Sequence, residues 1–164
     1  MDTIEAIKKR RSVRQFGDAA VPKGLIEQAV DAARFAATAR NEQPWEFVAV
    51  TDRAAVGAVA RMTDHGKFMA GAPACVAVFC RDTKYYLEDG AAATQNLLVA
   101  AAALGLGSCW IAGDKKPYAA LIAEFLGVPA GFRLVSLVAL GYPQGESVLP
   151  EKRELKALLH WEKF

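Results

Sequence analysis

Residues 88–113 read EDGAAATQNLLVAAAALGLGSCWIAG, and this stretch decides the fold. It opens with two acidic residues, is almost wholly small or aliphatic as far as Leu104, and breaks at Gly105. Alanine and leucine are strong helix formers, and negative charge in the first turn suits the positive end of a helix. The stretch therefore predicts a helix over 88–104, about 25 Å long at about 1.5 Å per residue.

A helix that is apolar all round must be buried on every side. Two arrangements satisfy this requirement, and both stay open from the sequence. The helix could be the central core helix of one chain, or it could also pack against its own copy across a dimer axis, where its alanines permit close backbone approach. It is not expected to cross a membrane, because a span needs roughly 20 apolar residues and Thr94, Gln95 and Asn96 interrupt this one.

The composition is that of a globular chain of one domain. The chain has 164 residues, long enough for a real core. Hydrophobic residues make up 53% and charged residues 23%, a slight apolar excess that an oligomer would bury. The formal net charge of +2 is too small to indicate nucleic acid or an anionic membrane as a partner.

The cysteines are predicted to be buried, inert thiols. Cys75, Cys80 and Cys109 are odd in number, lack a C-x-x-C spacing and fall in apolar runs. With two histidines in the chain, a Cys/His metal site is not expected. The N-terminal residues lack the apolar region of a secretory signal, so we expect a cytoplasmic protein.

Helices and strands are predicted to alternate along the chain. Periodicity and capping residues indicate helices at 3–9 (N-cap Thr3), 22–37, 53–62 (N-cap Asp52) and 115–126 (N-cap Asp114), and strands at 45–51, 74–80, 108–111 and 133–140. This order favours a sheet covered by helices on both faces. From Gly141 the chain is a tail without periodicity. Its apolar end, residues 158–164, is expected to lie on another surface, that of a partner subunit.

The densest positive charge lies in the segment 8–14, KKRRSVR. It could be a solvated charged face, or an anion site in which arginine forks and a serine hydroxyl hold a phosphate or a polarised carbonyl. A nucleic-acid contact is disfavoured, because no aromatic residues are interleaved and the net charge is low. The first two interpretations stay open.

Other familiar catalytic patterns are missing from the sequence. Residues 105–110, GLGSCW, lack the third glycine of a dinucleotide fingerprint and follow a helix instead of a strand. Gly105 is therefore interpreted as a helix stop, and Gly113 as a point of close backbone approach. There is no G-x-S-x-G motif, and a helix N-terminus accounts for Glu88 and Asp89. A chain with few candidate catalytic acids or bases but a cluster of cations suggests that a bound cofactor carries the chemistry.

These pieces together resemble the FMN-dependent nitroreductase family, in its short, single-domain branch. The residues that carry the resemblance are RRSVRQF (10–16), NEQPWEF (41–47), LGLGSCWI (104–111) and LGYP (140–143), in the family's order and across nearly the whole chain. The resemblance implies an α+β fold of three α/β/α layers, with a mixed, mostly antiparallel sheet in a single domain over 1–164. It also implies an intertwined homodimer with the long helix at its core and a tail from about 142 packed on the partner.

The resemblance further implies two FMN sites in the subunit interface, each built from both chains. Arg10, Arg11 and Ser12 would hold the phosphate and ribityl end, and Arg14 would face the N1/C2-carbonyl edge of the flavin. The remaining implied contacts are Ala37, Thr38, Ala39 and Asn41 from the other subunit, backbone at Ile111, Ala112 and Gly113 along the N5 side, Lys152 and Arg153 at the phosphate, and His65 or Lys67 at the pyrimidine.

The implied activity is an oxidoreductase that passes a hydride from NAD(P)H through flavin N5 to a nitroaromatic, a quinone or a related acceptor. The alternatives are a dehalogenase or other specialised flavin enzyme, and a non-catalytic flavin-binding protein.

Two departures from the family pattern affect the predicted site. The tail order Lys152-Arg153 replaces a spaced pair of cations, and Ala112 stands where some relatives have an acidic residue.

Overall fold

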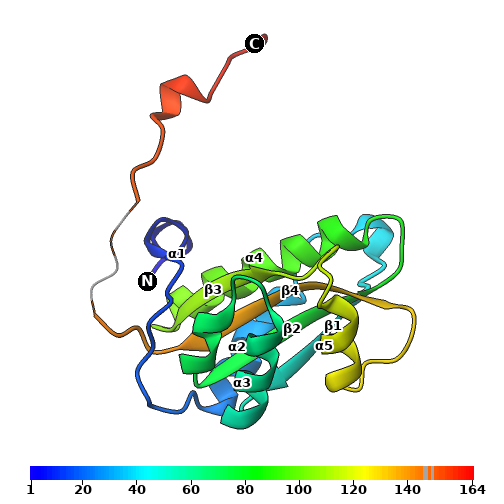
Figure 1. The fold of residues 1–164 in the computed structure, drawn as a ribbon. Coiled ribbons are helices and arrows are strands. Elements are labelled where there is room, and N and C mark those ends of the chain that lie inside the picture. Colours follow the sequence, from blue (N-terminus) through cyan, green and yellow to red (C-terminus); the bar gives the residue numbers. More distant parts are fainter. Residues whose placement is uncertain (146–147, 149) are drawn as a thin grey trace.

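Four antiparallel strands form the central sheet, in the order β1-β2-β4-β3. They are β1 (Trp45–Val50), β2 (Ala74–Arg81), β3 (Gly107–Ala112) and β4 (Phe132–Gly141). The structure, a computed structural model, describes residues 1–145, 148 and 150–164 (Figure 1). The strands lie within a residue or two of the predicted segments, because continuous apolar runs favour strands that are covered on both faces.

The two central strands supply both halves of the core. Along β2, Cys75, Ala77 and Phe79 face one side of the sheet, and the residues between them face the other. A β-bulge interrupts the alternation on β4, because Val78 lies opposite Ser136 whereas Phe79 lies opposite Leu134. The extra residue, Val135, turns toward the same side as Ser136 and enlarges that half of the core.

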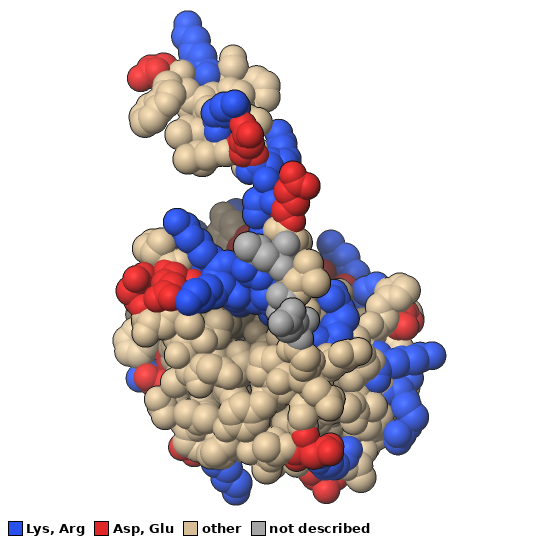
Figure 2. Space-filling view, turned by 90° about the vertical axis from the view of Figure 1, so that its left-hand side faces the viewer, with Lys and Arg blue, Asp and Glu red and all other residues tan. Residues whose placement is uncertain are grey.

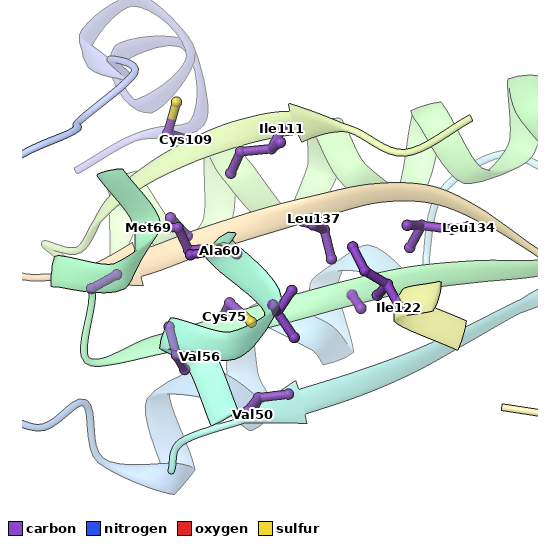
Figure 3. Packing of buried hydrophobic residues seen from close by; sticks show 14 of the residues in the cluster. Val50, Val56, Ala60, Met69, Cys75, Cys109, Ile111, Ile122, Leu134 and Leu137 are labelled. Atoms are coloured by element: carbon purple, nitrogen blue, oxygen red, sulfur yellow. The ribbon is translucent and has the colours of Figure 1, made fainter. Parts of the chain in front are cut away.

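One face of the sheet is covered by α3 (Arg53–Met62), the 3-10 helix η2 (Lys67–Gly71) and α5 (Ala119–Phe125). Figure 3 shows part of this cluster, with Val56 and Ile122 packed over the central strands. The other face is covered by α2 (Lys23–Ala33) and α4 (Tyr86–Ala103). The predicted three-layer α/β/α arrangement is therefore confirmed.

The helix α4 is the predicted long helix, and it lies against α2 and the sheet while α1 (Thr3–Lys9) packs along it. In mid-helix the Thr94 hydroxyl lies 2.8 Å from the hydroxyl of Ser136. The helix ends at the predicted stop, where Gly105 adopts a φ of 78°. Burial is one-sided in a single chain, however, because Glu88 and Gln95 are exposed and the alanines beside them are only half-buried.

Two predicted caps were wrong. Asp2, rather than Thr3, caps α1 by accepting from the Glu5 amide at 2.9 Å. The helix predicted at 115–126 begins only at Ala119, because the Asp114 carboxylate accepts a hydrogen bond from the Tyr86 hydroxyl at 2.6 Å and caps nothing. Helix α2 also ends earlier than predicted, at Ala33. The cap of α3 by Asp52 is confirmed.

The tail extends away from the body (Figure 1). Its described residues from Pro150 onward are all exposed, including the 3-10 turn η3 (Leu155–Ala157). Trp161 is 76% exposed, whereas tryptophan side chains are on average highly buried in folded proteins. Three residues of the predicted tail, 146, 147 and 149, lie outside the described part of the chain. None of the helices in the described residues is long and apolar enough to cross a membrane.

Candidate cofactor-binding site

The cation segment is attached to the edge of the sheet. Ser12 forms an isolated parallel bridge with Ser108 of β3, and the Val13 amide donates to the Ser108 carbonyl at 2.9 Å. Val13 and Phe16 are buried in the core and anchor the segment. Ser12 and Arg14, which lie on either side of Val13, stay exposed as a result.

These cations line one open hollow of about 630 Å³, a size typical of ligand sites. Its walls are Arg10, Arg11, Ser12, Val13, Arg14, Gln15, Gln144, Val148, Pro150 and Lys152. Figure 2 shows lysine and arginine side chains gathered on the α1 side of the body, at the foot of the tail. Among the described residues, no carboxylate forms an ion pair with an arginine of this segment or with Lys152. This concentration of unneutralised charge suits an anionic ligand.

The arginines of the segment are held differently. Arg11 donates through Nη1 to the carbonyls of Lys8 and Arg10, both at 2.7 Å, and so satisfies the C-terminal end of α1. Arg14 makes one long contact of 3.5 Å from Nη1 to the Ser12 carbonyl, and its guanidinium lies 5.8 Å from the centre of the Phe68 ring. Arg14 is therefore positioned by an aromatic face and keeps most of its donors available to a ligand.

The backbone at the end of β3 is held by several hydrogen bonds. The Tyr118 hydroxyl donates to the Ala112 carbonyl at 2.5 Å, and the Gly113 and Asp114 amides donate to the Val135 carbonyl at 3.1 and 3.2 Å. A Cβ on Gly113 would lie 2.6 Å from Leu134 Cγ, which confirms the close approach predicted there. Residues 111–113 thus form a rigid backbone edge.

The loop between α3 and β2 packs against this edge. A Cβ on Gly66 would lie 2.9 Å from a methyl carbon of Ile111, and the Thr63 hydroxyl accepts from the Gly66 amide at 3.0 Å. The loop therefore lies next to the candidate site, with His65 and Lys67 exposed. A direct contact of either residue with a ligand stays a prediction.

Cys109 lies between the core and the cation segment, and Figure 3 shows its sulfur on the side toward α1. Burial raises the pKa of this thiol, and the nearby positive charge of Arg14 with a hydrogen bond from Ser12 offsets the rise only in part. The thiol is 2% exposed, so it behaves as the inert side chain that the sequence predicts.

The loop that contains Ala37, Thr38, Ala39 and Asn41, predicted to contact a flavin from the other subunit, lies against the first turns of α4. Asp89 in the first turns of α4 accepts hydrogen bonds from the Thr38 hydroxyl at 2.8 Å and the Ala39 amide at 3.1 Å. The hollows beside Arg10 are instead lined by Gln95 and Ala102, further along the same helix. From Asp89 the helix rises by about 9 Å to Gln95 and by about 20 Å to Ala102. One chain therefore does not bring this loop and the cation segment together.

The two tail cations are also separated. Lys152 lines the hollow with Arg10 and Arg14, whereas Arg153 donates to the Ala157 carbonyl of the tail at 3.1 Å. The sequence reasoning missed Phe68, Tyr118 and the loop-binding role of Asp89, because all three act through contacts between distant segments. An acidic residue at the start of a long, mostly apolar helix was the available clue to Asp89.

This combination of a three-layer fold and an edge-bound cation segment defines the class to which the chain belongs. Residues 7–66 and 65–142 match the profile described as the nitroreductase family. A protein of Archaeoglobus fulgidus, provisionally named NADH dehydrogenase/NAD(P)H nitroreductase, is 34% identical over 153 residues, covering 88% of this chain and 87% of the relative. The chain belongs to the nitroreductase family.

Two solved structures agree with this assignment. An FMN-dependent nitroreductase from Clostridium difficile matches with a TM-score of 0.91 at 26% identity, covering 98% of this chain and 99% of that chain. A nitroreductase with bound FMN from Bacteroides fragilis matches with a TM-score of 0.83 at 25% identity, covering 99% and 100%. The fold implied by the sequence resemblance is therefore confirmed.

Proposed function

We propose that this protein is an FMN-dependent oxidoreductase that uses NAD(P)H to reduce nitroaromatics, quinones or related electron acceptors. The observation that carries the proposal is the hollow where Arg10, Arg14 and Lys152 converge. Family membership, the name of the Archaeoglobus fulgidus relative and the FMN bound in the Bacteroides fragilis structure support the same chemistry.

The residues present fit FMN. A phosphate needs several cationic or hydroxyl donors, which Arg10, Arg11, Ser12 and Lys152 offer from one hollow. Arg14 would lie at the N1/C2-carbonyl edge, where its fixed positive charge would stabilise negative charge on the reduced ring. The backbone of residues 111–113 would border the N5 side and exclude water there.

When bound, the flavin supplies hydride acceptance and donation at N5. The protein's contribution is to bind, orient and polarise it, and the described residues around the hollow offer cations and backbone groups for that task. We propose that nicotinamide and acceptor occupy the same open hollow in turn, which gives ping-pong kinetics. Solvent or the substrate provides the protons.

We also propose a homodimer in which each site takes residues from both chains. Ala37, Thr38, Ala39 and Asn41 of one chain would meet the cation segment of the other, since the two regions lie apart within one chain. The half-exposed side of α4 and the apolar tail supply surface for this association. The three buried, free thiols are compatible with a cytoplasmic location.

Spectroscopy and steady-state assays test the proposal. The purified protein is expected to be yellow, to elute as a dimer, and to oxidise NADH or NADPH when menadione or a nitrofuran is added. A flavin-binding protein without catalysis would be yellow but inactive with both donors. A colourless protein that gains no flavin absorbance on titration with FMN would falsify the cofactor assignment.

The Arg10→Ala/Arg14→Ala variant is expected to lose FMN. The control variant Lys23→Ala, which removes an exposed cation on α2, should retain it.

A further inference from the structure

We infer that Asp89 is a positioning residue that acts across the dimer interface. It holds the loop 38–43 of its own subunit in the shape that meets the cofactor bound by the other subunit. This inference rests on the proposed function, which supplies the FMN and the shared site. It adds a buried residue that does not itself touch the ligand.

The side chain of Asp89 holds the loop against α4 through hydrogen bonds. Its side chain is 4% exposed, and its two oxygens accept from different loop groups, the Thr38 hydroxyl at 2.8 Å and the Ala39 amide at 3.1 Å. The same Thr38 hydroxyl accepts from the Gln43 amide at 3.2 Å. One buried carboxylate therefore fixes both ends of a six-residue loop through a single relay.

The loop needs such a clamp, because its backbone is strained. Arg40 and Asn41 both have a φ of 56°, and Gln43 has a φ of 46°, in the left-handed region that side chains seldom adopt. Strain of this kind persists only where surrounding contacts impose it. Two further contacts, from the exposed Arg81 side chain to the Glu42 carbonyl and from Gln43 Nε2 to Asn41 Oδ1, lie at the surface.

The strain presents residues outward. Arg40, Asn41 and Gln43 are exposed, whereas Asp89 beneath them is buried. A loop that served only to connect α2 with β1 could relax into an unstrained path. A fixed, outward-facing loop is instead what a site shared with another subunit requires, since a displacement of about 1 Å in a binding group can cost on the order of a hundredfold.

Asp89→Ala removes both acceptors and should weaken FMN binding by at least roughly tenfold, with a changed visible circular dichroism of the flavin that remains. Asp89→Asn keeps the shape and one acceptor, so it should recover part of the affinity. Thr94→Val is the matched control, because Thr94 is fully buried on the same helix and bonds to Gly90 and Ser136, away from the loop. It should lower the unfolding temperature without changing the FMN dissociation constant.

Mixed dimers test the action across subunits. One chain carries Asp89→Ala and the other carries Arg10→Ala/Arg14→Ala, with different affinity tags for purification. If the loop serves the opposite chain, one site per dimer combines an intact loop with intact arginines, and about half of the FMN capacity remains. If the loop serves its own chain, both sites are damaged and FMN binding is lost.

The outcomes separate the two proposals. Wild-type protein that binds no FMN would overturn the proposed function. Wild-type protein that binds FMN, together with Asp89→Ala that binds it equally well, would overturn the role of Asp89 alone. If Asp89→Ala fails to fold, the FMN affinities of Asp89→Asn and Thr38→Val test the inference instead. The inference requires that Asp89→Asn and Thr38→Val each weaken FMN binding more than the control Thr94→Val does. If all three of these variants bind FMN with equal affinity, the inference is overturned.

Discussion

Ser12 and Ser108 face each other in a parallel bridge, the only parallel pairing of this sheet among the described residues. The bridge joins the chain that follows α1 to the edge strand β3. As a result, the arginines near the N-terminus lie beside β3, although about 100 residues separate the two segments along the chain. The candidate site depends on this pairing.

Arg14 should set the reduction potential of bound FMN. Its guanidinium lies over Phe68 and is in no ion pair with another described residue, so its charge is available to the ligand. Arg14→Ala is expected to weaken FMN binding and to lower the two-electron potential, because a neutral side chain no longer favours the negatively charged reduced ring. Redox titration measures the shift, and Arg14→Lys should restore part of it. An unchanged potential would remove Arg14 from this role.

Lys152 should matter more than Arg153 for the FMN phosphate. Only Lys152 lines the hollow with Arg10, whereas Arg153 donates to a carbonyl within the tail. Lys152→Ala is expected to weaken FMN binding by about tenfold, the value of one charge-assisted hydrogen bond of about 1.4 kcal/mol, and Arg153→Ala by less. Isothermal titration with FMN and with riboflavin, which lacks the phosphate, measures both effects. The Lys152 effect should vanish with riboflavin.

Gly90→Ala should destabilise the protein although alanine favours helices. A Cβ at Gly90 would lie 2.7 Å from a methyl of Val135 and 2.9 Å from the Cys80 sulfur, so α4 would be pushed from the sheet. Overpacking costs about 1–3 kcal/mol, against at most about 1 kcal/mol gained in helix propensity. Gly24→Ala on α2 meets nothing within 4 Å and should be neutral or stabilising. Urea unfolding measures both free energies, and a Gly90→Ala variant as stable as Gly24→Ala would contradict this packing.

Alkaline pH should destabilise the fold through the buried thiols. Burial raises the pKa of Cys75 to about 12 from its ordinary 9.0, and burial together with the charge of Asp89 raises the pKa of Cys80 to about 12. Below pH 9 the thiols are neutral in both states, so they add no pH dependence. Between pH 9 and about 12 only the unfolded chain loses the proton, and stability falls by about 1.4 kcal/mol per pH unit for each thiol.

Unfolding free energies measured from pH 8 to pH 11 check the sign of this effect. Cys75→Ala should make the decline shallower, while other titrating groups contribute equally to both proteins. A Cys75→Ala protein with the same slope as the wild type would show that this thiol ionises freely in the folded state.

Most elements could be predicted from local sequence. The long apolar run gave α4 and its stop at Gly105, and Asp52 gave the start of α3, because propensity and capping depend on neighbouring residues only. The prediction failed at Asp114, whose capping role was lost to a hydrogen bond with Tyr86, 28 residues away. Rules based on neighbouring residues cannot predict a hydrogen-bond partner that lies so far away in the sequence.

The candidate site likewise combines features that the sequence predicts with contacts that only the folded chain creates. By itself the sequence determined the order of elements, the cation segment 8–14 and the family that these motifs indicate, since each is a pattern along the chain. Only the tertiary structure decided that Phe68 lies against Arg14, that Asp89 is buried beneath Thr38, and that this loop and the cations lie apart within one chain. Those relationships follow from which faces pack together, and packing joins residues that the sequence keeps far apart.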